Sequence, residues 1–194
     1  MEIFLIRHGE TTGDIEDKYG GDYDDNLTKK GTAQANKLGR KLEGKGIQII
    51  YSSPLIRAQE TSKILSKFLG VEIKTVKDIK ERNRYGILTG ITKKEAKEKH
   101  PQAFEDVKDF KNTIEAAEEY EEFVGRITNA FSKLLKVDYE TIAVVTHGGP
   151  LYIIFEKVLS FKWGRAEDCG FAVLDVKNGE INVLSSEGIS FKEI

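Results

Sequence analysis

The sequence predicts an α/β fold: a three-layer α/β/α sandwich with a mostly parallel sheet and an antiparallel C-terminal edge. Three observations lead to this prediction. Short continuous apolar runs at 3–6, 47–51 and 142–145 are typical of strands buried on both faces of a parallel sheet. Amphipathic helical patterns separate these runs, and a hairpin signal follows the last of them.

Three segments between the strands repeat apolar residues at helical spacing. The first follows Thr28, a favoured N-cap residue, and the second has Pro54 at its predicted first helical position. The apolar positions are Gly31, Ala35, Leu38 and Leu42 in the first, Leu55, Ala58, Leu65 and Leu69 in the second, and Tyr120, Phe123, Ile127, Ala130 and Leu134 in the third. Each segment is expected to lay one apolar face on the sheet.

The C-terminal part has a different pattern. Residues 171–176 and 181–184 flank Asn178-Gly179, the strongest two-residue hairpin signal, so antiparallel strands are expected there. The charged stretch within 87–119 has few apolar anchors. We interpret 1–194 as a single domain in which 87–119 is a helical, lid-like insertion.

Composition restricts the classes of partner. The chain of 194 residues has 30 Lys and Arg against 32 Asp and Glu, so neither a nucleic-acid-binding field nor a basic membrane patch is expected. Its single cysteine, Cys169, excludes an internal disulfide, and the apolar run at the N-terminus is too short for a signal peptide. We therefore expect a cytoplasmic protein, in which an anionic ligand would need a local cluster of cations.

Polar side chains follow three of the predicted strands. Arg7-His8 comes directly after the first strand, His147 after the last parallel one, and Arg57 lies in the first turn of the helix after residues 47–51. Ligands of open α/β sheets bind beyond the carboxyl ends of the strands. Pro150 is predicted to open a helix whose N–H groups face an anion. One histidine at a strand end is usually structural, but three segments with the same placement favour a phosphate site.

Four motifs resemble the histidine phosphatase superfamily, the phosphoglycerate mutase-like group. They are LIRHGET at 5–11, SSPLIRA at 52–58, THGG at 146–149 and a loop-to-helix pattern at 26–35. Their order and spacing agree over nearly the whole chain. The resemblance implies a phosphatase that acts on small phosphorylated substrates and needs no metal or other cofactor.

The resemblance also implies roles for the matching residues. His8 would attack phosphorus and form a phosphohistidine, while Arg7, Arg57 and His147 would stabilise the charge that develops on the phosphoryl oxygens. ERNRYG at 81–86 resembles the mutase segment ERHYG with one extra residue, which implies that Glu81 is the acid and base. Taken alone, a glutamate in such a charged run would be a solvated surface residue.

The chain departs from the family pattern at two places. Gly13-Asp14 stands where the family often has Trp-Asn, and Leu88-Thr89-Gly90 stands for Trp-Glu-Gly. Asp14 would put a negative charge near an anion, so it either turns away or meets a cationic partner such as Arg84. The predicted substrate-binding residues are Arg7, Thr11, Asp14, Arg57, Arg82, Tyr85 and Gly148.

Two other functions stay open. A phosphoglycerate mutase would use the same phosphohistidine, and the short chain favours hydrolysis over it. A non-catalytic phosphate-binding module would have no need of Glu81. The sequence leaves the identity of the substrate and the oligomeric state open.

Two further features are given ordinary interpretations. The acidic residues at 22–26 lack the turn glycine and closing glutamate of a calcium loop, so we interpret them as a solvated or substrate-facing loop. Cys169 is interpreted as a small buried thiol.

Overall fold

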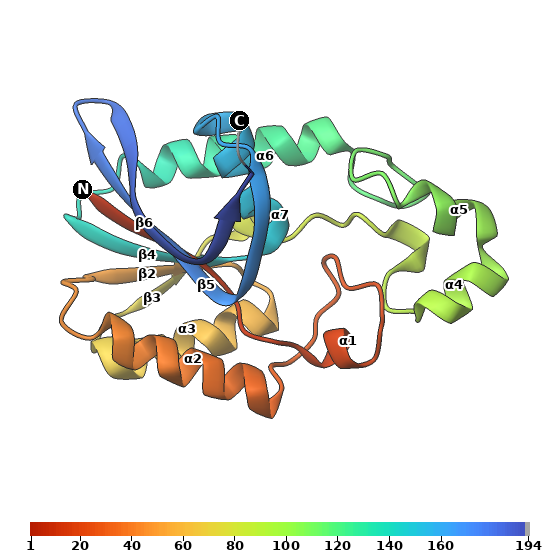
Figure 1. The fold of residues 1–194 in the computed structure, drawn as a ribbon, viewed down its shortest axis with the longest axis horizontal. Coiled ribbons are helices and arrows are strands. Elements are labelled where there is room, and N and C mark those ends of the chain that lie inside the picture. The colour runs from red at the N-terminus through yellow and green to blue at the C-terminus, as the bar shows by residue number, and fades with distance from the viewer. Residues whose placement is uncertain (193–194) are drawn as a thin grey trace.

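The computed structural model describes residues 1–192, which form a mixed six-stranded sheet with helices on both faces (Figure 1). The strand order is β3-β2-β4-β1-β5-β6. The strands are β1 Glu2–Arg7, β2 Ile49–Ser52, β3 Ile73–Thr75, β4 Thr141–Thr146, β5 Trp163–Lys177 and β6 Glu180–Phe191. Strands β1 to β4 pair in parallel, whereas β5 pairs antiparallel to β1 and to β6. The predicted sheet type and its antiparallel edge are confirmed.

Helices cover the sheet on both sides, which completes the predicted three-layer fold. Figure 1 shows α2 and α3 on one face and α6 and α7 on the other. The helices are α1 Thr12–Ile15, α2 Lys29–Leu42, α3 Ile56–Leu69, α4 Lys93–Lys99, α5 Pro101–Asp106, α6 Tyr120–Leu134 and α7 Gly148–Ile153, with short turns η1 Lys77–Ile79, η2 Gly86–Leu88 and η3 Ile154–Val158. A hydrophobic cluster fills each interface, and alternate residues of β1 point to opposite clusters.

The register of the central strands decides where the site forms. Arg7 pairs with Thr146 at the carboxyl ends of β1 and β4, so the residues that follow, His8 and His147, leave the sheet side by side. On the other side of β1, the pairing with β5 ends at Ile6 and Phe171. All these positions lie at the edge from which α1 and the insertion extend (Figure 1).

Helix starts agree with the sequence patterns to within two residues. Thr28 caps α2 by accepting from the Gly31 N–H at 2.9 Å, as predicted. The prediction that Pro54 opens α3 is wrong, because the helix begins at Ile56, whose N–H donates to Asp24 Oδ1 at 2.6 Å. The prediction that Pro150 opens α7 is also wrong by two residues. Pro150 is the third residue of α7, where an N–H would have no intrahelical acceptor, so the missing N–H of proline costs no hydrogen bond.

The structure has one strand that was not predicted and two strands that are longer than predicted. Strand β3 was not predicted, because its three residues are an edge segment with a single apolar side chain, Ile73. The hairpin strands β5 and β6 are longer than 171–176 and 181–184, since they continue past a bulge. The turn itself is as predicted: Asn178 and Gly179 have φ of 53° and 83°, as a two-residue hairpin requires.

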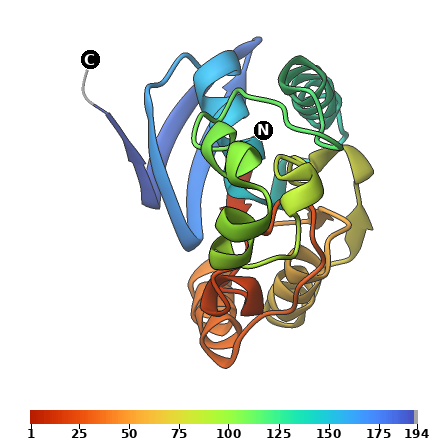
Figure 2. The same ribbon diagram turned by 90° about the vertical axis from the view of Figure 1, so that its right-hand side faces the viewer.

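Residues 87–119 form a small helical unit beyond the carboxyl edge of the sheet. Helices α4 and α5 lie there, in front of that edge in Figure 2. A separate small core holds the unit together, consisting of Tyr19, Leu88, Ala96, Val107 and Ile114. That this insertion acts as a lid stays a prediction. Within residues 1–192, every helix is too short or too polar to cross a bilayer.

Candidate active site

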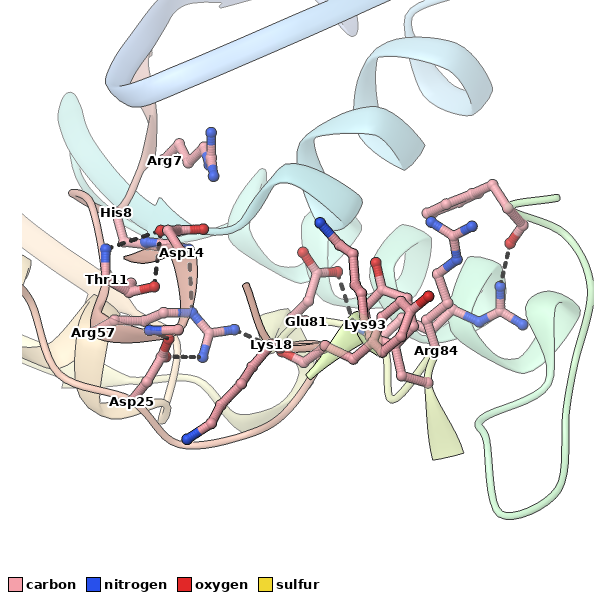
Figure 3. A pocket seen from close by; sticks show the side chains of 17 residues that line it. Arg7, His8, Thr11, Asp14, Lys18, Asp25, Arg57, Glu81, Arg84 and Lys93 are labelled. Atoms are coloured by element: carbon pink, nitrogen blue, oxygen red, sulfur yellow. Dashed lines mark hydrogen bonds and ion pairs between the residues drawn. The ribbon is translucent and has the colours of Figure 1, made fainter. Parts of the chain in front are cut away.

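A cavity of about 360 Å³ lies at the carboxyl edge of the parallel strands (Figure 3). It brings together most of the site residues predicted from the sequence. These are Arg7, His8, Thr11, Asp14, Arg57, Glu81, Arg82 and Tyr85. Lys18, Tyr19, Asp25, Arg84, Lys93 and Phe110 also line it. A cavity of this size accommodates a small molecule.

His8 is held so that one ring nitrogen faces the cavity. Its backbone N–H donates to the Thr146 carbonyl at 3.1 Å, and its Nδ1 lies 2.8 Å from the Gly9 carbonyl oxygen. Because a carbonyl only accepts, Nδ1 carries the proton and Nε2 keeps its lone pair. The Arg57 Nε–H donates to that lone pair at 3.2 Å. His8 is thus oriented as a nucleophile.

The surroundings of His8 keep it neutral. Burial lowers its pKa well below the ordinary value, and the positive charges of Arg57 and Arg7 lower this pKa further. The imidazole Nε2 therefore stays unprotonated at neutral pH, which nucleophilic attack requires.

His147 lies against His8, with ring centroids 4.9 Å apart. Its Nε2 lies 2.7 Å from Ser53 Oγ, which also accepts from the Leu55 N–H at 3.3 Å. When the Ser53 hydroxyl donates to Nε2, the proton of His147 lies on Nδ1, which is buried and has no partner within residues 1–192. Burial, followed by Arg57, lowers the pKa of His147 too, so it offers a neutral donor.

Arg57 is buried and held from several directions. Its Nη1 donates to the Tyr23 carbonyl at 2.6 Å and to Asp25 Oδ1 at 2.9 Å, and its Nη2 donates to the Gly21 carbonyl at 2.7 Å. Asp25 is equally buried, and its Oδ2 accepts from the Gly13 N–H at 3.3 Å. Sequence reasoning missed Asp25, because an acidic residue in an acidic loop gives no signal that it is paired.

Arg7 reaches the cavity from the end of β1. Its Nη1 donates to the Ala166 carbonyl at 2.7 Å and lies 3.2 Å from Asp168 Oδ1. Both partners belong to β5, and neither contact was predicted from the sequence.

Glu81 enters the cavity from the loop between η1 and η2. Its Oε2 accepts from the Gly149 N–H in the first turn of α7 at 2.9 Å, and its Oε1 accepts from the Arg82 N–H at 2.8 Å. A Cβ on Gly149 would lie 2.0 Å from Glu81 Oε1, so any larger residue at that position would have to displace the Glu81 carboxylate. Arg126 supports the loop by donating to the Lys80 carbonyl at 3.0 Å.

Asp14 turns toward the start of α1. Its Oδ2 accepts from the Thr11 N–H at 2.9 Å and from the Thr11 hydroxyl at 2.8 Å, which forms a capping box. These contacts agree with the alternative in which Asp14 turns away, and within residues 1–192 it forms no ion pair with Arg84. Contact of Thr11 or Asp14 with substrate stays a prediction.

Arg82, Tyr85 and Gly148 occupy different settings. Arg82 is fully buried and donates to three backbone carbonyls of the insertion, those of Phe110, Asn112 and Glu118. Tyr85 packs on Tyr19 with ring centroids 4.7 Å apart, and Gly148 begins α7. The geometry gives Arg82 a structural role, and substrate binding by these three residues stays a prediction.

A family model for the histidine phosphatase superfamily, branch 1, matches residues 3–192. The chain belongs to this superfamily. It is 32% identical over 189 residues to phosphoglycerate mutase-like protein 4 of Arabidopsis thaliana, which covers 94% of the chain and 78% of that relative. It is 32% identical over 163 residues to a metal-independent phosphoserine phosphatase of the same plant, covering 81% and 68%.

The fold agrees with solved structures of similar proteins. Bacillus stearothermophilus YhfR superposes with a TM-score of 0.87 at 25% identity, over 97% of each chain. The expectation of a histidine phosphatase-like enzyme is therefore confirmed at the level of the superfamily.

The geometry of this superfamily member suits phosphoryl transfer. A neutral histidine faces two arginines and a buried imidazole donor, with a carboxylate at the same cavity. Such a set can attack phosphorus, stabilise negative charge and move a proton. Within residues 1–192, no three His, Cys, Asp or Glu side chains are grouped as metal ligands.

Proposed function

We propose that the protein is a metal-independent phosphatase that hydrolyses small-molecule phosphate monoesters through a phosphohistidine on His8. The observation that carries the proposal is the state of His8: its Nδ1 donates to Gly9, its pKa is lowered, and its Nε2 lone pair lies beside Arg57 Nε. The single cysteine and the balanced charge favour a cytoplasmic enzyme.

In the first step, His8 Nε2 forms a bond to phosphorus while the bond from phosphorus to the leaving oxygen breaks. Glu81 gives its proton to that oxygen. The Arg57 Nε–H shifts its hydrogen bond from His8 Nε2 to a phosphoryl oxygen, and Arg7 and the His147 Nδ1–H bind the other oxygens. Each preorganised donor of this kind contributes about 3 kcal/mol to stabilising the transition state.

In the second step, water attacks the phosphorus of phosphohistidine. Glu81, now a carboxylate, takes the proton of the water, the bond from His8 Nε2 to phosphorus breaks, and inorganic phosphate leaves. The N–H groups of Gly149 and Arg82 hold both carboxyl oxygens, so the same group is in place for both steps.

A phosphoglycerate mutase is the second candidate. The segment Glu81–Gly86 resembles that of mutases, and one relative is called a phosphoglycerate mutase-like protein. A mutase must hold its phosphohistidine away from water. Similarity to a metal-independent phosphoserine phosphatase favours hydrolysis.

The test is a panel of phosphate esters assayed in the presence of a chelator. The panel includes 3-phosphoglycerate with and without its bisphosphate, and His8→Ala is assayed in parallel. We expect phosphate release that survives chelation and falls at least about 1,000-fold in His8→Ala. Isomerisation without release would favour the mutase, a need for added metal would contradict the mechanism, and phosphate binding without turnover would indicate a binding module.

A further inference from the structure

Strand β5 contains a bulge next to the end of β1. Its register with β6 shifts between Ala166 and Phe171, and Cys169 has φ of 56°, in the left-handed region that non-glycine residues rarely adopt. A strained backbone of this kind persists only where surrounding contacts fix it, and it often marks a functional position.

The bulge makes three contacts with the two residues at the end of β1. The Ala166 carbonyl accepts from Arg7 Nη1 at 2.7 Å, and Asp168 Oδ1 lies 3.2 Å from the same nitrogen. The Cys169 N–H donates to the His8 carbonyl at 3.1 Å. The bulge therefore contacts both the nucleophile's backbone and the arginine beside it.

We propose that Asp168 is a positioning residue that fixes the Arg7 guanidinium for phosphoryl transfer. This proposal rests on the proposed function. Asp168 lines a hollow adjacent to the catalytic cavity and acts through Arg7, so it need not contact substrate.

The distribution of contacts on Arg7 supports this role. The Ala166 carbonyl accepts from Nη1 and Asp168 forms an ion pair with the same nitrogen, whereas within residues 1–192 neither Nε nor Nη2 has a hydrogen-bond acceptor. The two remaining nitrogens form one edge of the planar fork, which is the edge that binds two phosphoryl oxygens at once. Because the Arg7 side chain is 24% exposed, it would otherwise sample several rotamers.

The charge of Asp168 gives the proposal a distinct signature. Burial raises the pKa of Asp168 and the adjacent Arg7 lowers it, and the ionised carboxylate repels a bound phosphate. Asp168 thus improves the orientation of Arg7 while it weakens the binding of phosphate in the ground state. Loss of the carboxylate should lower kcat without weakening phosphate binding.

The experiment compares Asp168→Ala with Asp168→Asn, which keeps an oxygen acceptor without the charge. We expect kcat to fall about 10-fold to 100-fold in Asp168→Ala, as for a slightly misplaced catalytic group. The Kd for inorganic phosphate should stay the same or decrease. Asp168→Asn should restore kcat to within about threefold of the wild type, because its amide oxygen keeps a polar contact with Arg7 Nη1 at the position of Asp168 Oδ1.

Two controls separate positioning from general damage. Glu167→Ala removes the neighbouring acid, which is 58% exposed and pairs with Arg165, and it should leave kcat unchanged. In an Arg7→Met background, Asp168→Ala should cause no additional loss, because the two residues act as one unit.

The Arg7 Nε–H signal in a ¹H–¹⁵N spectrum tests the proposal independently of turnover. It should shift and broaden in Asp168→Ala and recover in Asp168→Asn. An unchanged signal in Asp168→Ala, or a kcat of Asp168→Asn as low as that of Asp168→Ala, would overturn the proposal. Absence of ester hydrolysis by the wild type would instead contradict the proposed function, and the spectrum would still decide the role of Asp168.

Discussion

The position of the proton on each of the two buried histidines determines what each of them can do in the site. In the proposed mechanism His8 is the nucleophile, because Gly9 fixes its proton on Nδ1 and because burial and two arginines keep it neutral. In the same mechanism His147 donates through Nδ1, with the Ser53 hydroxyl donating to its other nitrogen. Neighbouring groups therefore suit one histidine to nucleophilic attack and the other to hydrogen-bond donation.

Glu81→Gln tests the proton transfer at this scale. We expect turnover of esters with poor leaving groups to fall about 100-fold to 10,000-fold, because the leaving alkoxide loses its proton donor. With nitrophenyl phosphate the rate of the first step should fall much less, since nitrophenolate leaves without a proton. The measurement is the rate of leaving-group release in single turnovers on both substrates, and equal losses would reject the assignment of Glu81.

At the scale of elements, the start of α7 positions both His147 and the N–H group that binds the Glu81 carboxylate. His147 is the residue before the helix, and the Gly149 N–H in its first turn holds the Glu81 carboxylate. The glycine matters for space, since a methyl group there would overlap the carboxylate.

Gly149→Ala should therefore impair turnover by displacing Glu81. We expect a loss on poor leaving groups of the same order as that of Glu81→Gln, about 100-fold or more. The matched control is Gly125→Ala in α6, where an added methyl group meets nothing within 4 Å. Full activity of Gly149→Ala would show that the contact between Gly149 and Glu81 is dispensable.

Caps and turns that depend on neighbouring residues could be predicted from the sequence, whereas contacts between residues far apart in the chain could not. The cap at Thr28 and the turn at Asn178-Gly179 depend on neighbouring residues, so their sequence patterns sufficed. The motifs likewise indicated His8, Arg7, Arg57 and His147. In contrast, Asp25, Asp168 and Arg126 support the site through partners 32 to 161 residues away, which no periodicity encodes.

At the scale of the whole molecule, the sheet carries the phosphoryl site and the insertion closes one side of the cavity. Arg82 links the site to the insertion: it follows Glu81 in the chain, and it donates to the carbonyls of Phe110 and Asn112 in the insertion. The remainder of the cavity is lined by residues such as Tyr19 after α1, Arg84 in the loop between η1 and η2, and Lys93 in the insertion. Substrate choice is expected to depend on these outer residues.

The buried histidines also make stability depend on pH. Their pKa values are lowered in the folded state, so the unfolded chain binds more protons below its ordinary histidine pKa of about 6.5. The free energy of unfolding should therefore fall as pH decreases from about 6.5, by up to about 1.4 kcal/mol per pH unit for each histidine.

Urea unfolding between pH 7.5 and pH 5.5 measures this slope. His8→Asn and His147→Asn should each reduce it, whereas His100→Asn, in the insertion, is the matched control and should leave it nearly unchanged. A slope that is the same in all four proteins would contradict the burial of neutral imidazoles at the site.

The most direct measurement is the capture of the covalent intermediate. Glu81→Gln is mixed with nitrophenyl phosphate, which can phosphorylate His8 without help from an acid. The phosphohistidine should then accumulate, because the variant lacks the base that activates water for its hydrolysis. The sample is quenched in alkali, where phosphohistidine survives, and its peptides are sequenced by mass spectrometry. We predict a phosphoryl group on His8, and its absence in His8→Ala. A phosphoryl group on another residue, or nitrophenol release with no labelled peptide, would contradict the mechanism.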